Sequence, residues 1–387
     1  MSTRMCRASA VALAIVPCAG AAAQVEFVPL GELAGGERFS KATGVSDDGR
    51  YVGGGSIGSG AGLTPVRWHG TTPEPLALPP GFDLGAEVND ISGDGMWVVG
   101  MGPGPSAFVG LRWEPDGTPV ITGDFAPPGW SSANSINGDG SVITGFGGLG
   151  FLENTSEMFR WTPGAGEEPL GDLAGGDFFS NGTAVSNDGA VLGGYATDAL
   201  GPRPVNWTGG VGFSVLATPD GGSGLGRVLG LSHDGLVSLG EAEVGGAFLP
   251  ARWQAGEGEV LGAPPLGYST GHAIASNADG SLAVGIWREN EFSDELGSIA
   301  FIWDEAHGAR LLADALLSDY GLDTSGWTLN MVTDMTPGGT TLVGYGLNPE
   351  GDFQAFKIVV PGPGGLAVLL AGAAGFGRRV SSPRSRR

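Results

Sequence analysis

The side chains best suited to acid–base or metal chemistry are four histidines and a set of aspartates in one repeated motif. His69, His233, His272 and His307 lack the spacing that places several imidazoles on one metal ion. The aspartates lie in tetrapeptides such as Ser186-Asn187-Asp188-Gly189. Each tetrapeptide offers one or two carboxylates, whereas calcium takes about six to eight oxygen ligands. We therefore predict that the motif forms turns and that the chain has no metal site.

The familiar catalytic motifs give no reaction. We find no nucleophile elbow at a strand-to-helix turn, no His-Glu-x-x-His and no phosphate-binding loop before a helix. We therefore predict no catalytic residue and no cofactor. The function must be inferred from the elements that carry the aspartates.

The aspartate motif belongs to a unit that occurs seven times, with steps of 46, 45, 49, 46, 45 and 59 residues between its turn glycines. A period of this size is typical of repeat proteins. Ser or Asn, then Asp, then Gly fits a type I turn whose last residue is left-handed, and such a turn closes a β-hairpin. The turn glycines are Gly49, Gly95, Gly140, Gly189, Gly235, Gly280 and Gly339.

Two further features recur in every unit. A second glycine follows each turn glycine by five residues, and a glycine inside a strand indicates a bulge or a close approach of two backbones. These are Gly54, Gly100, Gly145, Gly194, Gly240, Gly285 and Gly344. An apolar-polar-aromatic strand comes next, and six of the ten tryptophans share its register, which predicts common packing and not a ligand cage. They are Trp68, Trp113, Trp161, Trp207, Trp253 and Trp303.

A fourth short segment follows six of the tryptophan strands, and the seventh copy lies at the other end of the chain. The six segments are Pro75 to Leu78, Val120 to Thr122, Pro169 to Leu173, Ser214 to Ala217, Glu259 to Gly262 and Ala309 to Leu312. Phe27 to Gly36 matches Glu168 to Gly176, so the first strand completes the last unit. We predict an all-β fold over residues 24–360, a seven-bladed β-propeller of four-stranded blades with the ring closed by the N-terminal strand. The long sixth step contains a short helix, with Leu312, Ala315, Leu316 and Tyr320 on one face and Gly321 as its C-cap.

The two ends of the chain resemble targeting signals. Residues 1–23 have Arg4 and Arg7, an apolar run and small residues, which predicts a secretory signal peptide cut after Ala23. Both cysteines lie in it, so the mature chain has none. Residues 361–387 have an apolar run and an arginine-rich tail. We predict a C-terminal sorting signal with transient membrane association, and a plain tail anchor is the alternative.

The body between these ends is strongly acidic. It holds all 41 acidic side chains and 12 of the 19 basic ones, a net charge of −29. Such a charge repels phosphate backbones and keeps an exported protein soluble. We therefore predict no nucleic-acid partner and a monomer.

These motifs resemble those of a known group. The Ser-x-Asp-Gly hairpin, the glycine five residues later and the Arg-Trp strand are similar to HAF-type extracellular repeats, and Gly193-Gly194 resembles the end of a kelch blade. The tail resembles a PEP-CTERM signal, with Pro361, Gly362 and Pro363 where that family has Pro-Glu-Pro. The resemblance implies processing at these residues by an exosortase-type enzyme. It implies no biochemical activity.

Two functions follow from these features. The first is an exported structural or binding protein of the cell surface or extracellular matrix, without a catalytic site, whose partner is an extracellular polysaccharide or a surface protein. The alternative is a propeller-fold hydrolase or lyase acting on extracellular glycans. An enzyme would gather carboxylates, His, Arg or Tyr from several blades at one mouth of the axial channel.

Overall fold

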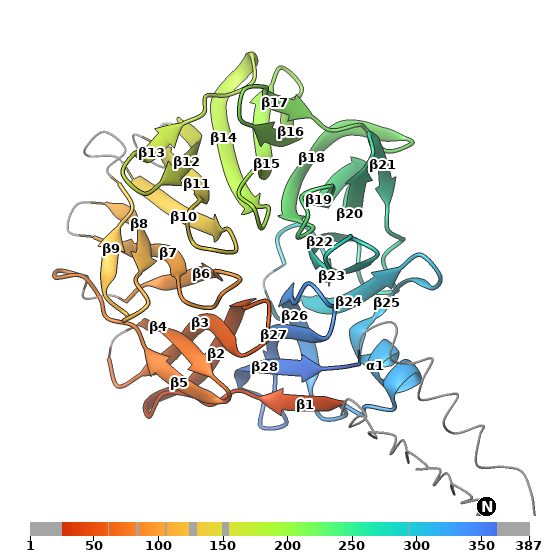
Figure 1. Cartoon of the computed structure of the whole chain (residues 1–387). Coiled ribbons are helices and arrows are strands. Elements are labelled where there is room, and N and C mark those ends of the chain that lie inside the picture. The colour runs from red at the N-terminus through yellow and green to blue at the C-terminus, as the bar shows by residue number, and fades with distance from the viewer. Residues whose placement is uncertain are drawn as a thin grey trace, which may run out of the picture.

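The protein is a ring of small β-sheets around a central axis (Figure 1). The computed structural model describes residues 25–60, 62–82, 85–104, 107–123, 130–148, 155–293 and 295–361. Ala23, Gly362 and Pro363, the signal peptide and the rest of the C-terminal tail lie outside these residues. In the described part, no helix is long and apolar enough to cross a membrane.

The sheets are antiparallel and four strands deep from the axis to the rim. The inner strands, nearest the axis, are β2 (Gly35–Val45), β6 (Glu87–Ile91), β10 (Trp130–Ile136), β14 (Gly175–Val185), β18 (Gly222–Leu231), β22 (Thr270–Ser276) and β26 (Thr328–Met335). The second strands are β3 (Tyr51–Gly58), β7 (Val98–Pro103), β11 (Ile143–Gly148), β15 (Val191–Asp198), β19 (Val237–Val244), β23 (Leu282–Arg288) and β27 (Thr341–Leu347).

The third strands carry the tryptophans. They are β4 (Leu63–His69), β8 (Phe108–Trp113), β12 (Ser156–Thr162), β16 (Gly201–Thr208), β20 (Ala247–Gln254), β24 (Ser298–Asp304) and β28 (Phe353–Val359). The outer strands are β5 (Thr72–Pro75), β9 (Pro119–Ile121), β13 (Gly166–Pro169), β17 (Gly212–Val215), β21 (Glu257–Val260), β25 (Gly308–Leu311) and β1 (Glu26–Pro29). The sequence placed most outer strands one to three residues too late, because each begins directly after the tight turn that ends the tryptophan strand.

The prediction of seven separate blades needs a correction. Five blades are separate four-stranded sheets, and strands β10 to β17 form one eight-stranded sheet. Within it, β10–β13 and β14–β17 each keep the antiparallel order of a blade, and a single parallel bridge between Ser156 and Phe179 joins them. The bridge lies where β14 runs beside β12, the tryptophan strand of the preceding unit.

The N-terminal strand closes the ring as predicted. Strand β1 pairs with β28 from Glu26 opposite Val359 to Pro29 opposite Phe356, so the last sheet has the order β1-β28-β27-β26. Phe27 packs against Phe356 and Trp327, with ring centroids 5.4 and 5.0 Å away. Trp327 therefore belongs to the packing of the closing blade.

The repeated tetrapeptides form the predicted turns. All seven turn glycines have φ between 64° and 75°, a left-handed conformation that a side chain disfavours. In the fourth unit, the Gly189 amide donates to the Ser186 carbonyl over 2.8 Å. The Asp188 carboxylate accepts the amide of Ala190 over 3.0 Å and the hydroxyl of Ser186 over 2.7 Å. The aspartates thus stabilise the hairpins that carry them.

We expect Asp188→Ala to lower the free energy of unfolding by about 0.5 to 2 kcal/mol, because a turn loses its capping acceptor. Calorimetry of the variant and the parent, with and without calcium, measures this loss. Calcium should leave both melting temperatures unchanged. A calcium-dependent rise that the substitution removes would show instead that the turns bind metal.

The second repeated glycine marks a close approach of two backbones. Each inner strand has a register shift within its last four residues, for example between Ala42 and Gly44, and the glycine lies opposite it. A Cβ on Gly54 would overlap the Lys41 carbonyl oxygen, and all seven glycines face the equivalent carbonyl. The bulge and the glycine are therefore one structural feature.

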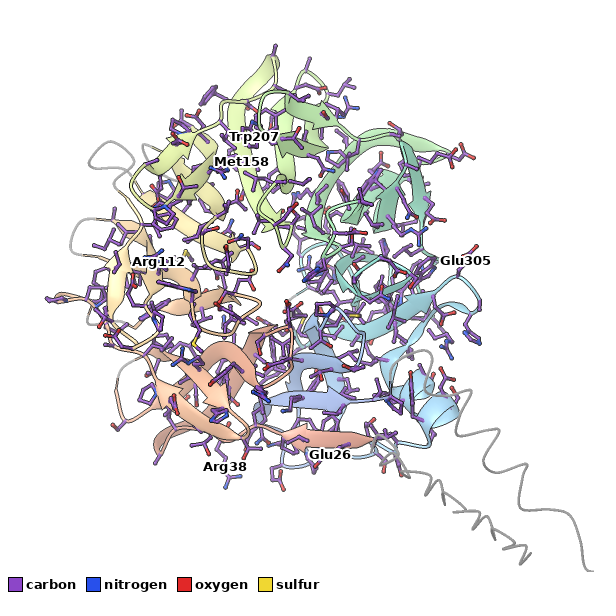
Figure 2. All side chains as sticks on the ribbon, in the orientation of Figure 1. Glu26, Arg38, Arg112, Met158, Trp207 and Glu305 are labelled. Atoms are coloured by element: carbon purple, nitrogen blue, oxygen red, sulfur yellow. The ribbon has the colours of Figure 1, made fainter. Side chains whose placement is uncertain are left out.

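Neighbouring sheets are joined by the Arg-Trp strand. The Trp68 and Trp113 rings are fully buried, and each indole N–H donates to a main-chain carbonyl over 2.7 Å. Arg112, on β8, lies among the strands on the left of the ring (Figure 2). Its guanidinium is 4.4 Å from the Trp97 ring centroid and 4.5 Å from that of Trp161 in the next sheet. The shared register thus serves packing, as predicted.

The single described helix, α1 (Leu312–Tyr320), lies at the rim beside β24 and β25 (Figure 1). Leu312, Ala315 and Leu316 are buried, and Gly321 caps the helix with φ 66°. Both features confirm the prediction from the sequence.

Candidate functional site

A cavity of about 380 Å³ follows the axis of the ring, between the seven inner strands. Its wall extends from Lys41 and Thr43, near the middle of β2, to Asp47 in the first turn. We call the end that carries the Ser-x-Asp-Gly turns the turn face, and the opposite end the loop face. The axial cavity is the larger of the two cavities described below and is the candidate functional site.

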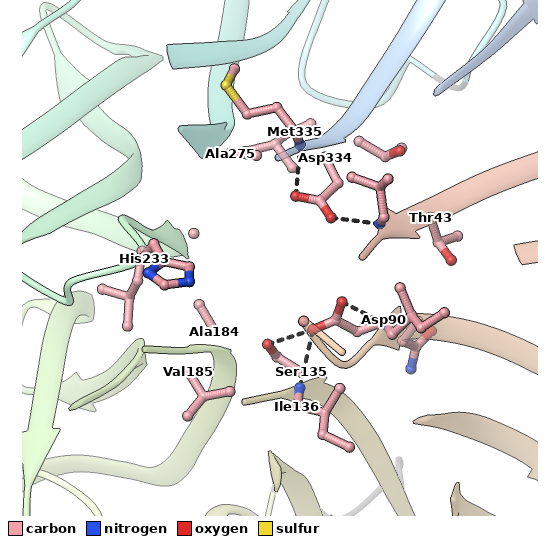
Figure 3. Close-up of a pocket in the computed structure, with 18 of the residues that line it drawn as sticks. Thr43, Asp90, Ser135, Ile136, Ala184, Val185, His233, Ala275, Asp334 and Met335 are labelled. Carbon is pink, nitrogen blue, oxygen red and sulfur yellow. Dashed lines mark hydrogen bonds between the residues drawn. The ribbon is translucent and has the colours of Figure 1, made fainter. Parts of the chain in front are cut away.

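Two half-buried aspartates face this cavity from different blades (Figure 3). Asp90 is the last residue but one of β6 and Asp334 that of β26, each two residues before the first residue of its turn. Both side chains reach the next inner strand around the ring. Asp334 accepts the amide of Val45 over 2.8 Å, and Asp90 accepts the amide of Ile136 over 3.0 Å and the hydroxyl of Ser135 over 2.8 Å.

Burial raises the pKa of both carboxyl groups. It raises the pKa of Asp90 to about 6, although the hydrogen bonds from Ile136 and Ser135 oppose this. The pKa of Asp334 is raised well above its ordinary value, first by burial and then by the negative charge of Asp90. The two carboxyl groups therefore interact through the cavity.

The bulge residues of several inner strands also reach the next strand. Asn89 donates to the Ala133 carbonyl over 2.9 Å, and Asn134 donates to that of Gly182 over 2.8 Å. Thr183 bonds the Val228 carbonyl over 2.7 Å, and Thr333 bonds that of Ala42 over 3.1 Å. The polar side chains that line the cavity thus largely form hydrogen bonds between neighbouring inner strands.

The turn face narrows the cavity. The turns bond to one another through main-chain groups, as where Asp47 donates to Gly93 over 2.8 Å and Ala278 donates to Pro337 over 2.8 Å. Pro337 has no N–H with which to continue the series to the first turn. The His233 Nε2 atom lies 3.3 Å from an Asp47 carboxylate oxygen, and this contact joins two units that are not neighbours in the ring.

A smaller cavity of about 180 Å³ lies on the loop-face side, between the sheets of β18–β21 and β22–β25. Arg227 and Glu241 line it from the first sheet, and His272 and Arg288 line it from the second. An Arg227 nitrogen is 3.5 Å from a Glu241 oxygen, and His272 Nδ1 is 3.8 Å from the other oxygen. This grouping has the kinds of residue that we required of an enzyme.

The four histidines are not brought together. His69 stacks on Tyr51 with ring centroids 5.0 Å apart, and His307 contacts Asp304 on the surface. His272, in contrast, lies in the inner strand β22 with a side chain that is mostly buried. The described residues contain no group of three or more His, Cys, Asp or Glu side chains placed to hold a metal ion.

Sequence analysis missed Asp90 and Asp334, although a signal was present. Aligned on the turns, the equivalent residues in the other five units are all uncharged: Gly44, Ser135, Ala184, Gly230 and Ala275. Ser56 also lies in a Gly-x-Ser-x-Gly sequence, which sequence analysis did not note. It lies buried in β3 and accepts the Leu33 amide over 3.1 Å, so it is not an exposed nucleophile.

We expect the half-buried aspartates to make stability depend on pH. The pKa of Asp90 is higher in the folded state than in the unfolded state, so protonation of this carboxyl group stabilises the fold. The stabilisation is fully present below the unfolded pKa of about 4 and is lost as pH rises through about 6. The free energy of unfolding should change by about 3 kcal/mol over this range. Denaturant unfolding between pH 4 and 8 should show a smaller slope for Asp90→Asn than for the parent. Asp314→Asn, which removes an exposed carboxylate on α1, should keep the parent slope. Parallel profiles for Asp90→Asn and the parent would contradict this assignment.

The chain matches no family model and no curated protein. Solved structures share its propeller fold at low identity. An oligogalacturonate lyase from Vibrio parahaemolyticus is 12% identical, with a TM-score of 0.52 over 87% of this chain and 92% of that chain. A puromycin hydrolase mutant is 13% identical, with a TM-score of 0.55 over 82% of this chain and 51% of that chain. TolB from Acinetobacter baumannii is 15% identical, with a TM-score of 0.42 over 81% of each chain. At these identities the lyase and hydrolase matches establish the fold alone.

Proposed function

We propose that this chain is an exported, non-enzymatic binding or structural protein of the cell surface or extracellular matrix. The observation that carries the proposal is the use of the polar groups in the axial cavity. Asp90 and Asp334 accept main-chain amides of the next inner strand, and the asparagines of the bulges donate to main-chain carbonyls there. A general acid or base must be able to exchange its proton with a substrate. Groups that hold the ring together instead support a rigid scaffold.

A rigid ring with an acidic surface suits a protein that works outside the cell. We count the eight-stranded sheet as two blades joined by one bridge, which gives seven blades around the axis. Its partner is an extracellular polysaccharide or a surface protein, and the axial cavity with its loop-face mouth is the proposed contact region. The net charge of −29 supports a soluble monomer that avoids nucleic acid and anionic lipid.

The experiment compares binding with turnover. Residues 24–360 are incubated with a panel of extracellular polysaccharides. Affinity electrophoresis measures retention, and mass spectrometry measures shortened or unsaturated products. We expect retention by at least one polysaccharide and no product after long incubation. Products that accumulate with time, and that disappear in His272→Ala, would overturn the proposal.

The alternative, a hydrolase or lyase acting on extracellular glycans, is favoured by the grouping of Arg227, Glu241, His272 and Arg288. We rank it second because of the basicity of its histidine. Burial and the nearby Arg288 and Arg227 lower the pKa of His272 to about 3, so it holds a proton poorly near neutral pH. Burial raises the pKa of Glu241, and Arg227 opposes this shift. A neutral imidazole beside an ion pair suits binding better than proton transfer.

We also expect the chain to be processed at both ends, after Ala23 and near Pro361, Gly362 and Pro363. Pro361 is the last described residue and is buried, and the preceding Val360 amide bonds the Thr340 carbonyl over 2.8 Å. Cleavage there would release an intact ring. Mass spectrometry of protein from the native cell envelope should find mature ends at these positions, and a mature pool ending at Arg387 would support a plain anchor.

A further inference from the structure

The smaller cavity holds two buried polar atoms that have no hydrogen-bond partner within the described part of the chain. They are Arg288 Nε and Thr270 Oγ1. The two residues are directly opposite in the ladder of β22 and β23, and both line the cavity. Because an unpaired buried polar group costs about 1 to 3 kcal/mol, such a pair calls for a partner from outside the chain.

The charges around the cavity favour an anion as that partner. Glu241 faces Arg227 across the β18–β19 ladder, with 3.5 Å between their nearest charged atoms. That contact leaves the positive charge of Arg288 without an ion pair among the described residues. Glu291, an exposed residue, is the other carboxylate at the rim. Elsewhere in the described chain, four other arginines also have a buried, unpaired Nε atom, but their other guanidinium nitrogens bond to the chain, as in Arg112 with Glu114 and Arg310 with Asp319 at 2.9 Å.

The remaining walls add a neutral donor and apolar surface. His272 has a side chain only 12% exposed, and its Nδ1 atom lies 3.8 Å from a Glu241 oxygen. A neutral imidazole can donate one N–H to an anion. Phe248 and Phe292 also line the cavity, and Phe292 is 87% exposed. They offer contact to the body of an organic ligand.

We propose that this cavity binds the carboxylate of a small organic acid or of an acidic sugar unit, with Arg288 as its charged partner and Thr270 and His272 as neutral donors. The planar guanidinium can hold both oxygens of a carboxylate at once. A volume of about 180 Å³ admits a single such unit and excludes a long polymer from the interior. The site lies apart from the axial cavity and does not depend on the proposed function.

Titration calorimetry of the body, residues 24–360, tests this with glucuronate and glucose, a pair that differs in the carboxylate. We expect glucuronate to bind and glucose to bind at least tenfold more weakly. Arg288→Gln should weaken glucuronate binding about tenfold or more, and Arg288→Lys should lie between this variant and the parent, because lysine keeps the charge and loses the fork. Arg50→Gln, which removes an exposed arginine beside Asp48 on the turn face, should bind like the parent.

Two results would overturn the proposal. Sulfate that binds as tightly as glucuronate, and competes with it, would show a general anion site without carboxylate preference. Glucuronate binding that is absent, or unchanged in Arg288→Gln, would remove the site. The melting temperature of each variant distinguishes a lost contact from a lost fold, and the Arg288→Lys variant keeps the test valid if Arg288→Gln is unstable.

Discussion

Deleting Glu26 to Leu33 should destabilise the ring by about 5 kcal/mol or more. The deletion removes strand β1 from β28, and it also removes the fully buried side chain of Leu30 from the core between the closing sheet and the first one. It also removes the Gly31 carbonyl that accepts the Trp68 indole N–H over 2.7 Å. Each fully buried large apolar side chain contributes about 1.5 to 3 kcal/mol, and an exposed sheet edge adds to the loss. Denaturant unfolding of the truncated and parent proteins measures the effect.

Two point variants serve as controls for the deletion. Leu30→Ala should lose about 2 to 5 kcal/mol, because it leaves a cavity between the closing sheet and the first one. Leu266→Ala should be neutral, because Leu266 is fully exposed. If the truncated protein melted at the same temperature as the parent, the ring would not depend on the N-terminal strand for its closure.

The second large effect is expected from Gly194→Ala, at about 3 kcal/mol. A Cβ at this position would overlap the Asn181 carbonyl oxygen on the facing inner strand, so the backbone must shift. The same replacement at Gly60 should change stability little, because nothing lies within 4 Å of its Cβ position. Thermal melts of both variants compare the two. A stability of Gly194→Ala close to the parent value would mean that the strands can move apart at the bulge.

The sequence was sufficient for most of the fold because its determinants are local. Each turn needs only its own four residues, and the match between Phe27–Gly36 and Glu168–Gly176 predicted which strand completes the last unit. The bridge between Ser156 and Phe179 could not be predicted, since it depends on how two neighbouring sheets lean toward each other. Outer-strand limits were also imprecise, because short rim strands have little burial pattern.

The sites were harder to predict, because their residues meet only across neighbouring units. Arg227 and Glu241 are opposite each other in one hairpin, so their contact could have been predicted from the repeat pattern. Their approach to His272 in the next sheet depends on the curvature of the ring. Asp90 and Asp334 differed from the residues at the same repeat position, but their burial and their bonds to the next strand are properties of the closed ring alone.

The order of the closing sheet also decides how the ring carries mechanical load. Strand β28 lies between β1 and β27, so it is held by a ladder on each side. A pull along the chain beyond Val359 acts along β28 and must shear both ladders together, since their hydrogen bonds run across the strand. A pull on Glu26 along β1 loads an edge strand, so it shears only one ladder. The C-terminal end is therefore the stronger point of attachment.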